Sequence, residues 1–280
     1  MPRLPNHSGH SRAHTPQIGT AQPGLLLPST GLLLQLWAGT SSSQLDGRAY
    51  LESDGTVACQ DGDPVGSLKD WSPSAYDFAT PFLAQRPILR GSGLGTNSRP
   101  HFEFTGTQTL YKSGVVGIGL NLQAYTIYLV IGNVSKTKDM FPFAQSHCVT
   151  RQYIQLNNAP KRIAFAHLDD SGNQSSIHSA PSTLTDGNAH LITVVRSGEH
   201  GFKLRYDNSK LVTGTTYPGP STTTITSIWA RSRMDDTRII ISNQYEGRIG
   251  LLAIYDNDNV ATLFDGSTIE NKINTFYGVF

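Results

Sequence analysis

Charged residues are scarce in this chain of 280 residues, since Lys, Arg, Asp and Glu make up only 15% of it and the formal net charge is +1. An average globular protein carries about 25% of such residues. A chain with so little net charge has no long-range field that would attract nucleic acid or an acidic membrane. We therefore expect neither nucleic acid nor a membrane as a partner.

Cysteines and long apolar runs are scarce as well. The two cysteines, Cys59 and Cys148, lie outside any CxxC or Cys/His cluster, which argues against structural zinc. Two buried thiols and one disulfide are both compatible with this pair. The runs Leu25–Leu27 and Leu32–Leu34 are far shorter than a membrane-spanning helix, and the first residues lack the apolar stretch of a signal peptide. We expect synthesis in a cytoplasm without the usual secretion route.

The motifs of common enzyme chemistry are also missing. There is no Gly-x-Ser-x-Gly elbow, no His-Glu-x-x-His and no phosphate-binding glycine loop. The stretch 91–95 is rich in glycine, but no helix follows it, so we interpret it as a turn. Isolated acids such as Glu103 and Glu246 have no partner at the spacing of a glycosidase pair. The sequence predicts a protein that is not an enzyme.

Residues 1–31 differ in composition from the rest of the chain. They contain five prolines and no acidic residue, which excludes a helix or a central strand. We expect an extended arm that docks on a neighbouring subunit; docking on its own domain and a flexible tail are the alternatives. The arm residues predicted to bind a partner are Arg3, Leu4, His7, Arg12, Ile18, Leu25, Leu26 and Leu27.

Residues 32–280 show the alternating and continuous apolar patterns of β-strands. We expect roughly ten to fourteen strands, enough for two sheets packed face to face. Ser267 and Glu270 form a capping box, and the apolar residues after it recur at helical spacing, which predicts a short C-terminal helix. The clearest strand segments are 32–37, 49–52, 56–59, 101–105, 125–132, 162–167, 190–196, 238–242 and 248–255.

Four short patterns follow one another in a fixed order along this part of the chain. They are Asp54-Gly55 through Lys69–Ser72, Arg86-Pro87 and Phe102–Gly106; the strand Tyr125–Gly132; Asp186–Arg196 with Lys203–Asn208; and Glu246–Asp256. Together they resemble the concanavalin A-like, laminin G-like jelly roll over about residues 32–278. The resemblance implies an all-β, antiparallel jelly-roll sandwich (residues 32–280) with the extended N-terminal arm (residues 1–31) and the short C-terminal helix.

The resemblance also suggests a role. Single domains with this pattern are similar to phage head-decoration, cement and tail proteins. The main functional hypothesis is therefore a virion structural protein, with capsid or tail proteins as partners and a homo-oligomeric state. In this hypothesis the arm anchors the protein and the jelly roll projects outward, so that many copies together provide affinity.

The alternative hypothesis is a carbohydrate-binding, lectin-like adhesion module that recognises a cell-surface glycan. Tyr76, Tyr153 and Trp229 are the candidate glycan-binding residues, and packing explains each of them equally well. Trp71 is expected in the core. A glycoside hydrolase is a third hypothesis, which the missing Glu-x-Asp-x-Glu strand of similar jelly-roll glycosidases disfavours.

We expect no cofactor. Calcium is the one metal that the resemblance brings into question, because related domains bind it through loop Asp, Asn and carbonyl oxygens. Four acidic pairs are candidates, and all of them are compatible with solvated turns: Asp61 with Asp63, Asp169 with Asp170, Asp235 with Asp236, and Asp256 with Asp258.

Overall fold

The computed structural model of this chain describes most of residues 25–280, with gaps. The described residues are 25, 27–39, 48–80, 82–112, 125–132, 140–146, 151–157, 162–168, 174–179, 186–197, 201–207, 212–213, 238–243, 245–256 and 268–280. Within them, no helix is long and apolar enough to cross a membrane.

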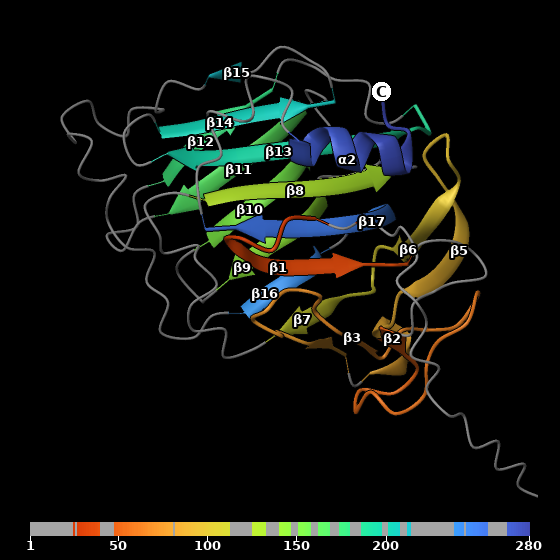
Figure 1. Cartoon of the computed structure of the whole chain (residues 1–280). Helices are drawn as coiled ribbons and strands as arrows, with labels where there is room; N and C mark the ends of the chain where they lie inside the picture. Colours follow the sequence, from red (N-terminus) through yellow and green to blue (C-terminus); the bar gives the residue numbers. More distant parts are fainter. Residues whose placement is uncertain are drawn as a thin grey trace, which may run out of the picture.

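The strands of the described residues form two antiparallel sheets (Figure 1). The first has eight strands: β15 (Val212–Thr213), β14 (Gly201–Tyr206), β13 (Ala189–Ser197), β8 (Tyr125–Gly132), β17 (Glu246–Tyr255), β6 (Arg99–Thr105) and β5 (Ile88–Leu94) in spatial order, with β1 (Leu32–Trp37) paired to β17. The second has nine: β12 (Gln174–His178), β11 (Arg162–Leu168), β10 (Arg151–Asn157), β9 (Met140–Ser146), β16 (Arg238–Asn243), β7 (Leu110–Lys112), β4 (Phe78–Ala79), β3 (Ser67–Leu68) and β2 (Ala49–Tyr50). A 3-10 turn, η1 (Leu83–Gln85), and a helix, α2 (Thr268–Tyr277), complete the described elements.

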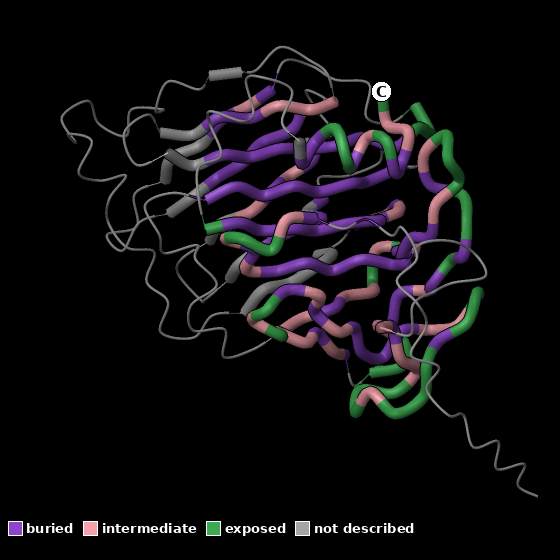
Figure 2. Tube along the Cα trace, in the orientation of Figure 1, coloured by how far each residue is buried: buried purple, intermediate pink, exposed green. Residues whose placement is uncertain are grey.

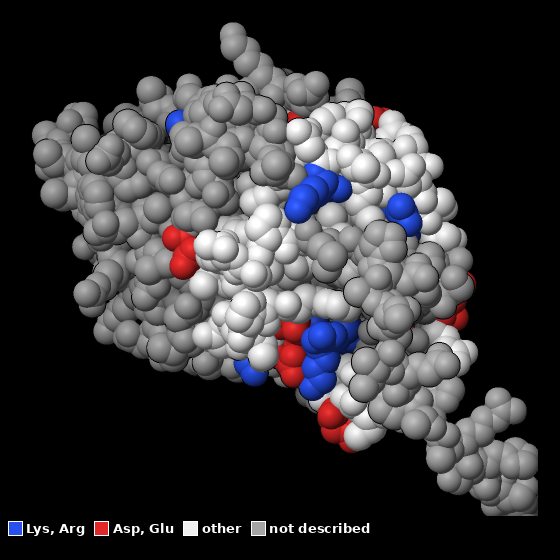
Figure 3. Space-filling model, in the orientation of Figure 1, with Lys and Arg blue, Asp and Glu red and all other residues white. Residues whose placement is uncertain are grey.

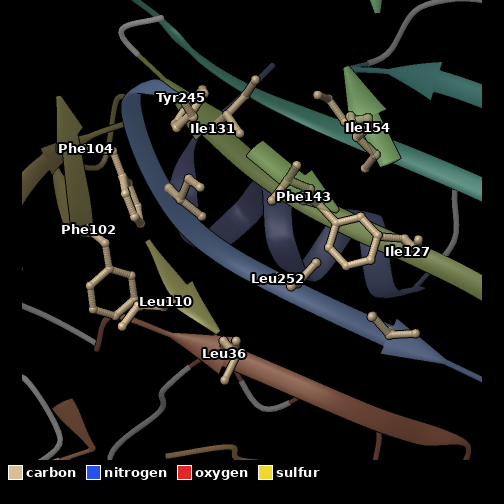
Figure 4. Close-up of a cluster of buried hydrophobic side chains, with 14 of the residues drawn as sticks. Leu36, Phe102, Phe104, Leu110, Ile127, Ile131, Phe143, Ile154, Tyr245 and Leu252 are labelled. Carbon is tan, nitrogen blue, oxygen red and sulfur yellow. The ribbon is translucent and has the colours of Figure 1, made fainter. Parts of the chain in front are cut away.

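The main core lies between the two sheets. Figure 4 shows Phe102 and Phe104 of β6, Ile127 and Ile131 of β8, and Phe143 of β9 in this layer. They alternate with side chains that face the opposite way, as the two-residue period of a strand requires. The fold class predicted from the sequence, an all-β antiparallel sandwich, is confirmed.

A second apolar cluster lies on the outer face of the eight-stranded sheet. The helix α2 covers part of this face with Ile269, Ile273 and Phe276, over β13 and β8 (Figure 1). Figure 2 shows β8 buried along its whole length, because apolar side chains cover both of its faces. This burial explains why residues 125–132 form a continuous apolar run instead of an alternating one.

The end of the predicted arm also covers the outer face. We call residues 25 and 27–31 the strap. Leu25 and Leu27 are only 4% and 9% exposed and pack in the outer cluster. Tyr255 Oη donates a hydrogen bond to the Pro28 carbonyl at 3.0 Å, and the Asp256 amide donates to the Gly31 carbonyl at 2.9 Å. Leu25 and Leu27, which the sequence predicts to bind a neighbouring subunit, pack here on the chain's own sheet, and their predicted role at a partner is not tested.

The Lys-Asp-Trp-Ser pattern closes the free edge of β1. Asp70 Oδ1 accepts a hydrogen bond from the Gln35 amide at 2.8 Å, the Trp71 amide donates to the Gln35 carbonyl, and Ser72 Oγ donates to the Leu33 carbonyl at 2.9 Å. These bonds occupy backbone groups that an unprotected edge strand would offer to another chain. Trp71 packs as expected, but against the outer cluster, with its ring centroid 5.3 Å from that of Trp37.

Most predicted strands are confirmed, although the described residues contain seventeen rather than ten to fourteen. The additional ones include β3, β4 and β15, of two residues each, which are too short to leave a period in the sequence. The glycine-rich stretch 91–95 is not a simple turn, since β5 continues as a strand to Leu94.

Candidate functional site

A row of polar side chains occupies the outer face of the eight-stranded sheet where α2 no longer covers it. We call Arg90, His101, Glu103 and Arg248 the polar strip. They lie on β5, β6 and β17, which are neighbours in the sheet. Phe102 and Phe104 of β6 point into the core, so His101 and Glu103, which alternate with them, point outward.

Two irregularities in the strands bring the strip together. In β5, three residues between Arg90 and Leu94 oppose a single one in β6, because Arg90 pairs with His101 and Leu94 with Arg99. The resulting bulge is built on Gly93, whose φ of +109° suits glycine. A Cβ on Gly93 would lie 3.5 Å from both Arg248 Nη1 and His101 Cε1, so the bulge passes directly over these two side chains. β17 has its own bulge between Ile249 and Leu251.

The charges of the strip are unevenly paired. Arg90 holds Glu103 in a two-point ion pair, with its Nε and Nη2 both 2.7 Å from Glu103 Oε2, and both side chains are partly exposed. Arg248 donates from Nη1 to the Gly93 carbonyl at 2.6 Å, and its buried Nε has no hydrogen-bond partner. No ion pair of Arg248 with a carboxylate occurs within the described part of the chain.

His101 lies between the two guanidinium groups and is only 2% exposed. Burial and the positive charge of Arg248 lower its pKa to about 4, so the imidazole is neutral at physiological pH. Its Nδ1 lies 3.5 Å from the Arg99 carbonyl, which is at the limit of a hydrogen bond, and Nε2 has no partner within the described residues. A neutral ring of this kind offers hydrogen-bonding capacity without charge.

The tip of the β5–β6 hairpin is fixed to the C-terminal end of α2. Asn97 Nδ2 donates to the carbonyls of Thr275 and Phe276, at 2.9 and 3.0 Å. Arg99 donates from Nε to the Phe276 carbonyl at 2.8 Å, and its guanidinium carbon lies 4.2 Å from the centre of the Phe276 ring. These contacts hold the strip on a rigid base, which lowers the entropy cost of binding a ligand there.

The strip combines donors and acceptors in a small area. Arg90 and Arg248 donate, Glu103 accepts, and the His101 ring can complement either. On the face shown in Figure 3, the charged side chains of the described residues stand in small separate groups. This face of the described residues therefore carries separate local charges and no broad patch of one sign.

The candidate residues from the sequence do not converge on this strip. Tyr76 packs against the main core, half-buried, and its amide donates to Asp70 Oδ2 at 2.9 Å. Tyr153 lies on β10 of the nine-stranded sheet, also half-buried, opposite Ala166 and Ala144. Seven predicted site residues lie outside the described part of the chain: Arg3, Leu4, His7, Arg12, Ile18, Leu26 and Trp229.

Asp61, Asp63 and Cys59 are the members of the candidate calcium pairs and the cysteine pair whose surroundings are described in full. Asp61 Oδ1 accepts from the Gly91 amide of β5 and Asp63 Oδ2 from the Gln60 amide of its own turn, both at 2.8 Å, so both carboxylates bind backbone amides of this chain. The described residues contain no cluster of three or more potential metal ligands. Cys59 is a buried free thiol whose pKa rises to about 12 through burial and the nearby Asp63. Cys148 and the remaining pairs lie wholly or partly outside the described residues: Asp169 with Asp170, Asp235 with Asp236, and Asp256 with Asp258.

No family model and no curated protein matches the sequence. Solved structures share its fold at low identity. The binding domain of Paraclostridial Mosquitocidal Protein 1 aligns with a TM-score of 0.58 at 11% identity, over 89% of this chain and 55% of that one. The receptor-binding domain of botulinum neurotoxin D aligns with a TM-score of 0.51 at 11% identity, over 89% and 52%. The binding domain of botulinum neurotoxin DC in complex with SialylT gives 0.51 at 11%, over 89% and 51%.

These likenesses show the fold alone, and this chain spans about half the length of the solved chains that it matches.

Part of the polar strip could be predicted from the sequence, because the alternation around Phe102 and Phe104 places His101 and Glu103 on one face. No pattern in the sequence predicts that Arg90 and Arg248 belong to the strip. Their contribution depends on the order of β5, β6 and β17 in the sheet and on two bulges.

Proposed function

We propose that this chain is a non-catalytic, lectin-like module that binds a carbohydrate of a cell surface through the polar strip. The observation that carries the proposal is the group of Arg90, His101, Glu103 and Arg248, a set of donors and acceptors with unused hydrogen-bonding capacity on a rigid sheet. Sugar hydroxyls need such mixed donors and acceptors. The solved structures of the same fold support the proposal, because they are a binding domain and a receptor-binding domain.

The test is a glycan array probed with the full chain and two double variants. R90Q/R248Q removes the two guanidinium groups of the strip, and K112Q/K272Q removes two positive charges elsewhere as the matched control. We expect glycan binding by the wild type and the control, and a loss of about tenfold or more in affinity for R90Q/R248Q. Absence of binding to every glycan would reject the carbohydrate proposal. Equal binding by all three proteins would reject the strip as the site.

The virion role suggested by the sequence stays a prediction. It depends on arm residues before the strap, which lie outside the described residues, and the solved structures that share the fold are named as toxin domains. A chain that begins at Leu25 retains the strap and lacks only that part of the arm. If the arm anchors the protein to a shell, the full chain should co-sediment with candidate capsid or tail shells and the shortened chain should not. Equal co-sedimentation would place the contact on the jelly roll.

A further inference from the structure

The polar strip has an excess of positive charge that its own residues do not neutralise. Glu103 is the only carboxylate of the strip, and Arg90 already binds it at two points. Arg248 has no ion pair with a carboxylate within the described residues, and its guanidinium donates there to the Gly93 carbonyl oxygen. The guanidinium of Arg248 is partly exposed, so an anion from solvent can reach it and supply the counter-charge that no carboxylate of the described residues supplies.

The surroundings of Arg248 favour an anion from outside the protein. His101, which lies under the same Gly93 bulge as Arg248, is neutral and adds no competing positive charge. The bulge around Gly93 leaves Ser92 and Gly93 exposed beside the guanidinium, so a ligand can approach over glycine backbone without meeting a large side chain. Arginine binds planar anions through parallel hydrogen bonds, which suits a carboxylate or a sulfate.

We propose that the ligand of the strip is an acidic saccharide, whose carboxylate or sulfate binds Arg248 while its hydroxyls contact the partly exposed Arg90–Glu103 pair. This inference rests on the proposed carbohydrate-binding function and adds the chemical class of the ligand. In the complex, Arg248 gains the counter-charge that the folded chain does not supply. Glu103 opposes the ligand's negative charge, and it keeps Arg90 in place.

Glu103 gives the sharpest test, because the two classes of sugar respond to it in opposite directions. For an acidic saccharide, E103Q removes a repulsive charge and releases Arg90, so affinity should rise by about fivefold. For a neutral saccharide, E103Q removes a strong acceptor of hydroxyl protons, so affinity should fall. R248Q should weaken an acidic saccharide by about tenfold or more, and K272Q on α2 should leave its affinity unchanged.

The experiment compares glycans that bear a carboxylate or sulfate with the same glycans after methyl esterification or desulfation. It uses the full chain, R248Q, E103Q and K272Q, and thermal unfolding of each variant verifies the fold. Binding restricted to the acidic forms, with the E103Q gain, supports the inference. Equal binding of acidic and neutral forms overturns it and leaves the carbohydrate function standing. No binding of any glycan overturns both.

An NMR titration of the imidazoles provides a readout that does not depend on the affinity of a variant. The positive charge of Arg248 helps to hold the pKa of His101 down at about 4. An anion bound to Arg248 offsets that charge, so saturation with the acidic saccharide should raise the pKa of His101. An unchanged His101 pKa in the saturated complex would contradict the placement of the anion.

Discussion

Asp70, the acidic residue of the Lys-Asp-Trp-Ser pattern, links several segments of the fold by hydrogen bonds. Its carboxylate accepts from the amides of Gln35, Ser72 and Tyr76 at 2.8, 2.8 and 2.9 Å, and from Ser72 Oγ at 2.6 Å. The side chain is buried, so each of these donors would lose its partner without access to water if the carboxylate were removed. The pattern that suggested a family in the sequence is therefore an edge clamp.

We expect D70A to lower the free energy of unfolding by about 3 kcal/mol or more, because several buried donors lose a charged acceptor. D54A is the matched control. Asp54 also accepts a backbone amide and a hydroxyl, from Thr56, but both bonds are exposed to solvent. It should cost about 0.5 kcal/mol or less. Urea unfolding of both variants measures the difference, and equal losses would contradict the clamp.

His190 is the second residue with an unusual environment. Its ring bridges Asp207, 2.8 Å from Nδ1, and Asp186, 3.0 Å from Nε2. Burial alone would lower the pKa of His190, but the hydrogen bonds and charges of Asp207 and Asp186 outweigh it and raise the pKa above 6.5. The folded protein therefore binds this proton more tightly than the unfolded chain does.

The sign of the pH dependence follows from the raised pKa. Stability from the His190 bridge is fully present below the ordinary histidine pKa of about 6.5 and is lost as the pH rises through the raised pKa of the folded state. Urea midpoints should therefore fall as the pH rises above about 6.5 in the wild type, with a shallower slope in H190Q. H178Q is a suitable control, because burial lowers the pKa of His178. An identical slope in the wild type and H190Q would exclude the bridge as its source.

The helix α2 is the element whose role the sequence revealed only in part. The spacing of Ile269, Ile273 and Phe276 predicts the helix and its buried face, and both are confirmed. The predicted capping box of Ser267 and Glu270 stays a prediction, because Ser267 lies outside the described residues. Glu270 is buried, accepts from Thr193 Oγ1 at 2.6 Å and forms an ion pair with Arg205. Its partners come from β13 and β14, and only the sheet topology brings them to the helix.

This ion pair leads to a prediction about helix docking. E270A should destabilise the fold by about 3 to 5 kcal/mol, because it leaves the Arg205 guanidinium partly buried without its counter-charge. The double variant R205M/E270M should recover much of that loss, since apolar side chains of similar volume can replace a buried pair. Urea unfolding measures both. A double variant as unstable as E270A would show that the pair itself, and not the unpaired charge, determines the docking.

The strap is the part of the predicted arm that belongs to the described residues. The composition of residues 1–31 suggested one uniform segment, yet its last part is packed on the sheet. We expect a chain that begins at Leu25 to keep the stability of the full chain. One that begins at Leu32 should lose about 3 kcal/mol or more, because two buried leucines and the Pro28 and Gly31 hydrogen bonds are gone. Equal urea midpoints for the two shortened chains would contradict a structural strap.

At the scale of the whole molecule, the sequence predicts the strands, whose apolar residues recur periodically. It does not predict the polar strip, whose residues come from strands far apart in the sequence. The apolar run of β8 and the alternation of β6 identify a sandwich before any topology is known. The polar strip combines residues 90 to 248 through strand order and glycine bulges, which no local pattern encodes. The proposed function therefore depends most on glycan binding at the polar strip.

The most direct measurement is a map of backbone amide chemical shifts of the full chain, titrated with the strongest glycan from the array. If a glycan binds at the polar strip, the largest shift changes should cluster on β5, β6 and β17 together, at Gly91–Gly93, His101, Glu103 and Arg248. Binding at the strip is contradicted if the strip stays unchanged and the shifts gather elsewhere, for example around Tyr153 on β10.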